Sequence, residues 1–131
     1  MARGRRGANA TEVALLMPAF AGLLLGLFDA GKYMLEASMV GDVTRMACRE
    51  GSLRLPEDQP AAVAQQTVLL LLRQRGYACA NSGDCVVTAV VSEDMLTCST
   101  DVLLGPGKGI LRIMPDRARV TDVRRLEVSF D

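Results

Sequence analysis

The sequence contains no histidine and no tryptophan, and its only aromatic residues are two tyrosines and three phenylalanines. Without histidine the chain lacks the commonest general base, the usual activator of serine and cysteine nucleophiles, and the ligand of most catalytic zinc sites. A folded core must therefore be built from Val, Leu, Met and Ala. Fifteen basic and 15 acidic residues leave no net charge, which argues against nucleic acid as a partner, because nucleic acid favours a strongly basic face.

A long apolar run lies near the N-terminus. From Ala8 to Ala30 the only charged residues are Glu12 and Asp29. The 22 residues that end before Asp29 would form a helix roughly 33 Å long at 1.5 Å per residue, close to the ~30 Å hydrocarbon core of a bilayer. We therefore expect a membrane span over residues 8–30.

The charges that flank this run predict its orientation. Three arginines lie within the first six residues, whereas the far side carries both signs of charge. The positive-inside rule then places residues 1–7 in the cytoplasm and the remainder outside. The exit from the run offers no convincing Ala-x-Ala site and the helical pattern continues beyond it, so a conventional cleaved secretory signal is disfavoured.

The helical pattern continues from the apolar run to Glu50, and Gly51 follows as the expected helix stop. Beyond the span, an apolar stripe at helical spacing predicts a face that packs on the protein's own outer domain. We therefore predict one helix over residues 8–50, half in lipid and half outside, and an extracytoplasmic domain over residues 51–131. The residues of the stripe are Met39, Val40, Val43, Met46 and Ala47.

The outer domain is predicted to contain a second helix and an antiparallel sheet, which makes the fold class α+β. Pro60 suits the first turn of a helix that continues over Ala61–Gly76. Cys85–Val91 is apolar on both faces and suits a covered central strand. Further strand candidates are Leu96–Leu104, which is weaker, Gly109–Met114 and the cleanly alternating Val123–Phe130.

Four cysteines lie on the predicted outer side, and an even count in a small extracytoplasmic domain favours disulfides. Three connectivities are possible. Cys79 and Cys85 flank a turn-forming stretch that could let them meet locally, in which case Cys48 would join Cys98. A four-cysteine zinc site is a weaker alternative because no Cys-x2-Cys pair is present, and free buried thiols are another.

The start of the chain resembles the signal of type IV prepilins: a basic leader, then Gly7, then Glu12 at the fifth position counted from Ala8, ahead of a long apolar helix. The stretch EVALLMP, which ends at Pro18, resembles the E-x-A-L-x-x-P opening of the TadE-like family of minor pseudopilins. The stretch RMACREG, residues 45–51, resembles that family's A-R-E-G close to the end of the helix.

This resemblance implies a pilin-like fold and a role in a bacterial pilus. A prepilin peptidase would cut between Gly7 and Ala8 on the cytoplasmic side. The mature chain would then join a Tad (Flp-type) pilus as a minor subunit that helps to initiate or cap the fibre. Its partners would be other major and minor pilins, the inner-membrane assembly platform and, before assembly, membrane lipid. The protein would lie in the bacterial inner membrane as a single-pass protein and afterwards in the pilus at the cell surface.

Glu12 and Pro18 have specific roles in this hypothesis. Cleavage creates a new α-amine on Ala8, which would attract Glu12 of a neighbouring helix strongly once water is excluded. The alternative is an ordinary anchor helix whose glutamate reaches the cytoplasmic interface, where its charge costs less than at the bilayer centre. Pro18 is expected to kink or loosen the helix near Ala14, which membrane helices tolerate when neighbours satisfy the freed carbonyl.

Three other interpretations stay open. The chain could be an unprocessed single-span envelope protein whose outer domain binds a ligand or partner. It could be a pseudopilin of a type II secretion system, although those proteins tend to carry Phe directly after the cleavage site, where this sequence has Ala8. An enzyme comes third, because the acidic residues are scattered without the spacing of a site. We expect no catalytic residue, no cofactor and no metal ligand.

Overall fold

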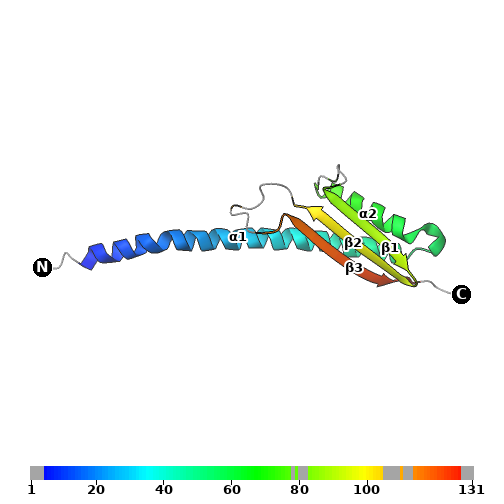
Figure 1. Ribbon diagram of the computed structural model, residues 1–131, viewed down its shortest axis with the longest axis horizontal. Helices are drawn as coiled ribbons and strands as arrows, with labels where there is room; N and C mark the ends of the chain where they lie inside the picture. The colour runs from blue at the N-terminus through cyan, green and yellow to red at the C-terminus, as the bar shows by residue number, and fades with distance from the viewer. Residues whose placement is uncertain (1–4, 78, 80–82, 105–109, 111–113, 128–131) are drawn as a thin grey trace.

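A computed structural model describes residues 5–77, 79, 83–104, 110 and 114–127, without the side chains of residues 5–11 and 56. The chain begins with a helix that is much longer than the rest of the fold, and its outer half and a second helix lie along a three-stranded antiparallel sheet (Figure 1). The predicted α+β class is confirmed. The elements are α1 (Arg5–Ser52), the short 3-10 helix η1 (Pro56–Asp58), α2 (Pro60–Gln74), β1 (Cys85–Ser92), β2 (Met95–Leu103) and β3 (Arg117–Arg125).

The end of α1 differs from the expectation that Gly51 stops it, because the helix continues through Gly51 to Ser52. A Cβ atom on Gly51 would lie 2.8 Å from the carbonyl oxygen of Pro60 and 2.9 Å from the Cβ of Ala64. Glycine is therefore needed at position 51 because α2 approaches α1 closely at this point. The reason is not a left-handed backbone conformation, since Gly51 is part of the helix.

The order of the strands corrects the expected place of Cys85–Val91. The sheet order is β1-β2-β3, so that this segment forms an edge strand and the weaker candidate, β2, is central. The helices cover one face of the sheet, and on β2 that face is buried: Leu96, Cys98, Thr100 and Val102. A central strand covered on one side needs an alternating sequence, which β2 has, and apolar residues on both faces are not required.

The third strand lies earlier than the expected Val123–Phe130, and the two overlap only at residues 123–125. Val123 is half exposed, whereas Leu126 is buried just after the strand ends and donates its backbone N–H to the carbonyl of Asp94. Residues 128–130 lie outside the described part of the chain, as does most of the candidate Gly109–Met114.

The core forms where the outer half of α1 meets α2 and the sheet. The predicted stripe is confirmed at Val40, Val43 and Ala47, which are buried against Val68 and Leu72 of α2 and against β2. It is wrong at Met46, which is 64% exposed. The buried face of α1 includes Thr44 and Cys48 instead, and both are fully buried. They belong to this face because α1 also packs on β3.

Candidate assembly helix and the outer-domain cleft

The first half of α1 stands clear of the outer domain, as Figure 1 shows. Between Glu12 and Phe28, where every side chain is described, no residue is buried. The large apolar side chains on this stretch point in all directions around the helix: Val13, Leu15, Leu16, Met17, Phe20, Leu23, Leu24, Leu27 and Phe28. An apolar surface of this size needs a partner, and lipid or other helices can supply it.

Within the described residues, α1 is also the one helix long and apolar enough to cross a membrane. Only 6% of its most apolar window is buried inside the protein. A core helix of a soluble protein would be mostly covered by its own domain, and this stretch is not. The length, composition and exposure of α1 fit a membrane anchor.

The residues singled out at the start of the sequence lie within the first turns of α1. Gly7 and Ala8 belong to its helical backbone, and Glu12 follows four residues after Ala8, about one turn further along. Glu12 is exposed. The structure thus leaves its carboxylate accessible to a partner from another molecule.

Pro18 lies inside α1, and the helix continues through it in both directions. Proline has no N–H group, so the carbonyl of Ala14 loses its usual partner one turn later. The exposed position of this turn makes the freed carbonyl available to a neighbouring group. The expected kink stays a prediction.

The predicted disulfides are present. Cys48 is bonded to Cys98 and Cys79 to Cys85, so that all four cysteines of the sequence are oxidised and none remains for a zinc site. Cys48 and Cys98 are 50 residues apart and buried, and their bond attaches the outer half of α1 to the central strand. Cys79–Cys85 closes a local loop of six residues just before β1.

A comparison with known protein families bears on this helix. Residues 7–49 match the family model described as TadE-like protein. The resemblance to the TadE-like family is thereby confirmed. The match covers nearly the whole of α1 and ends before the outer domain. No curated protein and no solved structure matches the chain.

The TadE-like match indicates a protein associated with the Tad pilus. The family consists of structural components and is not a known enzyme family. The family implies pilus subunits and the assembly machinery as partners in general. An exposed apolar helix at the N-terminus suits both a membrane anchor and a place among other helices in a fibre.

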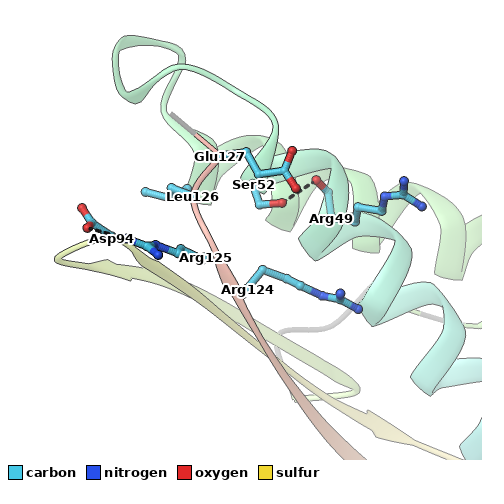
Figure 2. Close-up of a pocket in the computed structure, with 7 residues that line it drawn as sticks. All are labelled: Arg49, Ser52, Asp94, Arg124, Arg125, Leu126 and Glu127. Carbon is cyan, nitrogen blue, oxygen red and sulfur yellow. Dashed lines mark hydrogen bonds and ion pairs between the residues drawn. The ribbon is translucent and has the colours of Figure 1, made fainter. Parts of the chain in front are cut away.

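The outer domain carries a cleft of about 520 Å³, where the end of α1 meets the end of β3. Figure 2 shows Arg49 and Arg124 projecting along one side of it and Arg125 reaching Asp94 at the turn between β1 and β2. The guanidinium of Arg124 lies 2.8 Å from the carboxylate of Asp122 and that of Arg125 lies 3.9 Å from Asp94. Two of the three cationic groups thus have acidic partners, which leaves little net charge to attract an ion.

Two ionisable groups of the outer domain have displaced pKa values. The Arg117 guanidinium, helped by Arg119 and opposed by partial burial, holds the pKa of the Asp101 carboxyl below its ordinary value. Burial and then the nearby Glu36 carboxylate raise the pKa of Tyr77, with Arg75 opposing them. Asp101 lies on the uncovered face of the sheet, and Tyr77 packs against the core, so neither group forms part of the cleft.

The sequence interpretation missed one residue of α1 that the structure sets apart. Asp29 directly follows the 22 residues of the apolar run, but it is only 3% exposed and faces the outer domain through Ile110. A single acidic residue at the far end of an apolar helix is a weak signal, because the same pattern occurs where a helix simply leaves the membrane. Only the folded chain shows which group covers it.

Proposed function

We propose that this chain is a minor pseudopilin of a bacterial Tad (Flp-type) pilus, cleaved by a prepilin peptidase after Gly7 and built into the fibre, or priming it, through α1. The observation that carries the proposal is the exposed apolar surface on every side of residues 13–28. Within residues 13–28 only Leu25 and Gly26 are partly covered, so other molecules must cover the rest. The family match, which begins at Gly7, supports the same conclusion.

The same surface suits two successive environments. Before assembly, lipid covers the exposed apolar side chains, and the ~30 Å hydrocarbon core accepts a helix of this length. In the fibre, the corresponding helices of neighbouring subunits replace the lipid. A helix that must be covered equally well by lipid and by other helices needs apolar side chains all round, which α1 has before Asp29.

Glu12 would give this assembly its register. Removal of residues 1–7 creates an α-amine on Ala8, about one helical turn from Glu12 of the same chain. In a fibre, the exposed carboxylate of one subunit can approach the new amine of the next. Between two helices the attraction exceeds its value in water several-fold, because the surroundings are apolar.

The outer domain would move with the helix that anchors it. Cys48–Cys98 ties the outer half of α1 to the central strand, and Val40, Val43 and Ala47 pack beneath the same sheet. A force applied to the outer domain is therefore passed to α1 through a covalent bond as well as through packing. A subunit of a surface fibre needs such a connection.

The mass of the protein extracted from membranes of cells that contain a prepilin peptidase tests the proposal. We expect a mature chain that begins at Ala8, and a Gly7→Val variant that retains residues 1–7, because a branched side chain hinders access to the scissile bond. A wild-type chain that keeps Met1–Gly7 in cells that process another type IV prepilin would overturn the proposal. That result would favour an unprocessed single-span envelope protein.

A further inference from the structure

Asp29 is the one acidic residue between Val13 and Leu35. Its carboxylate oxygen Oδ1 accepts a hydrogen bond of 2.8 Å from the backbone N–H of Ile110, which lies 81 residues further along the chain. The residue is 3% exposed. Ile110 thus lies against the carboxylate on the side of α1 that faces the outer domain.

The opposite side of α1 stays apolar well beyond Asp29. Residues one turn apart on this side are Leu24, Leu27, Gly31 and Leu35, and Leu35 is 65% exposed. The next exposed residues along the same side are Ser38 and Asp42. The change from apolar to polar surface therefore comes between Leu35 and Ser38, more than one turn after Asp29.

The length of this surface agrees with the thickness of a bilayer. From Val13 to Leu35 the helix rises roughly 33 Å at 1.5 Å per residue, against a hydrocarbon core of ~30 Å. Besides Asp29 the only charge in this stretch is Lys32, whose ammonium lies 5.2 Å from the centre of the Phe28 ring. Lysine at the edge of a membrane can place its stem along apolar surface and its charge at the interface.

We propose that the lipid-facing surface of α1 extends from Val13 to Leu35 and that Asp29 lies at bilayer depth, shielded from lipid by Ile110. The partner of the uncovered side is the acyl-chain and headgroup region of the outer leaflet. Ile110 is 59% exposed beside the helix, and it enters the same interface. The span then lies about five residues further along than residues 8–30, and Glu12 lies at the cytoplasmic edge.

This placement does not depend on cleavage or on a pilus, because it concerns the full chain in a membrane. The carboxylate is hydrogen-bonded to Ile110 of the same chain, so that lipid on this side of α1 meets Ile110 and not a bare charge. Ionisable groups at bilayer depth are tolerated when they face protein and are paired in this way. The end of the outer domain that contains Ile110 would consequently lie in the headgroup layer.

Nitroxide labels on the full chain in vesicles of phosphatidylethanolamine and phosphatidylglycerol test the depth. The four native cysteines are in disulfides, so that single added cysteines at Leu24, Leu35 and Asp42 can be labelled separately. We expect the ratio of collisions with oxygen to collisions with a water-soluble nickel chelate to be highest at Leu24, lowest at Asp42 and intermediate at Leu35, which the proposal places at the edge of the hydrocarbon core. A ratio at Leu35 equal to that at Asp42 would place the bilayer edge near Asp29 and overturn the proposal.

A label on an Ile110→Cys chain tests the shield, because the backbone N–H remains in that variant. Asp29→Ala removes the acceptor and should raise the collision rate of this label with the nickel chelate several-fold, whereas Asp29→Asn keeps an oxygen acceptor and should leave the rate near that of the parent. Alanine is the best helix former, and a label at Leu24 checks that α1 still spans the bilayer. An Asp29→Ala chain that behaves like the parent at position 110 would contradict the shield.

Discussion

Cys48, close to the outer end of α1, is bonded to Cys98 in the middle of β2, and both residues are fully enclosed by the core. The bond closes a loop of 50 residues that contains α2 and β1. The only other covalent cross-link, Cys79–Cys85, closes a loop of six residues at a partly exposed site. The two bridges therefore differ both in the chain they constrain and in their access to solvent.

We expect the Cys48→Ala/Cys98→Ala variant to lose about 4 kcal/mol of unfolding free energy and Cys79→Ala/Cys85→Ala about 2 kcal/mol, from loop-closure entropy alone. Urea unfolding of the full chain in detergent, followed by tyrosine fluorescence, measures both. Tyr33 and Tyr77 pack on the core and there is no tryptophan to obscure them.

Access to reductant gives a second check on the same pair. A mild thiol should open Cys79–Cys85 first, because thiol–disulfide exchange needs an approach to the sulfur atoms, and Cys48–Cys98 should resist until the domain unfolds. Equal rates of reduction for the two bonds would contradict the burial of Cys48 and Cys98.

Gly51→Ala should destabilise the outer domain by about 1–3 kcal/mol, as overpacked core substitutions do. The added Cβ would lie 2.8 Å from the Pro60 carbonyl oxygen and 2.9 Å from the Ala64 Cβ. Backbone atoms of α2 cannot move aside as a flexible side chain can, and the cost should exceed the gain of about 1 kcal/mol in helix propensity. The same urea titration measures it.

Gly41→Ala is the matched control, because Gly41 is also buried in α1 and its nearest neighbour, Val120 Cγ1, would lie 4.0 Å from the new atom. Here we expect stabilisation of about 0.5–1 kcal/mol. If both glycines respond alike, the close approach of α2 to Gly51 is not the cause.

Thr100→Val should stabilise the domain by about 1 kcal/mol, since the substitution removes a buried hydroxyl without a hydrogen-bond partner. Thr100 is fully buried in β2, and its Oγ1 has no hydrogen-bond partner among the described residues. Valine has nearly the same shape and suits a strand. Thermal unfolding of the full chain compares the two.

Thr44→Val tests whether the stabilisation expected for Thr100→Val comes from the loss of the hydroxyl or from the added methyl group. Thr44 is equally buried, but its Oγ1 donates to the carbonyl of Val40 at 2.8 Å. We expect this variant to lose about 1 kcal/mol. Stabilisation by both valines would show that added apolar volume accounts for the effect at Thr100.

Acid should weaken the outer domain partly through Asp101. Its carboxylate accepts from Arg117 Nε at 2.7 Å and from Arg119 Nη2 at 2.8 Å, and these bonds, that of Arg117 foremost, lower its pKa below the ordinary value in the folded chain. Because the folded pKa lies below the unfolded one, this contribution is fully present above the ordinary pKa and is lost as the pH falls through the lowered value.

Asp101→Asn should therefore cost about 1 kcal/mol at neutral pH, a small value because both arginines are substantially exposed. It should also flatten the fall in stability below about pH 4. Asp94→Asn is the control: its pair with Arg125 is 3.9 Å long and mostly exposed, so we expect little effect. An acid profile of Asp101→Asn parallel to that of the parent would refute the assignment.

Glu12→Gln should prevent incorporation into fibres while leaving membrane insertion and the mass of the processed chain unchanged. Glutamine keeps the size of the exposed side chain but cannot attract the α-amine of Ala8 in a neighbouring subunit. Sheared fibres probed for this chain, next to the membrane fraction, measure incorporation. Glu12→Asp, which keeps the charge on a shorter stem, should retain part of it, and normal assembly of Glu12→Gln or Glu12→Ala would end the register hypothesis.

Several features of the fold could be predicted because they depend on local periodicity. The apolar run, the stripe through Val40, Val43 and Ala47, and α2 after Pro60 all follow from helical spacing. The alternative in which Cys79 and Cys85 pair locally is the one that the folded chain adopts. In each case the residues that decide the outcome lie close together in sequence.

Other features could not be predicted, because they depend on which segments meet. β1 looked central by composition, but the helices cover only one face of the sheet, and the alternating β2 suits the middle. β3 was placed too late because its four arginines hid a strand whose charges Asp101 and Asp122 partly balance. For Gly51 the decisive neighbour is α2, whereas its sequence context indicated only a helix end.

The sequence by itself determined that this chain has an apolar N-terminal helix of membrane length with a carboxylate at Glu12, because hydropathy and helical rise are properties of consecutive residues. Only the tertiary structure decided how far that apolar surface extends. Asp29 looked like its outer limit, but the N–H of Ile110 covers the carboxylate. A contact between residues 81 positions apart can hide a charge that the sequence displays, and the side of α1 opposite Asp29 stays apolar as far as Leu35.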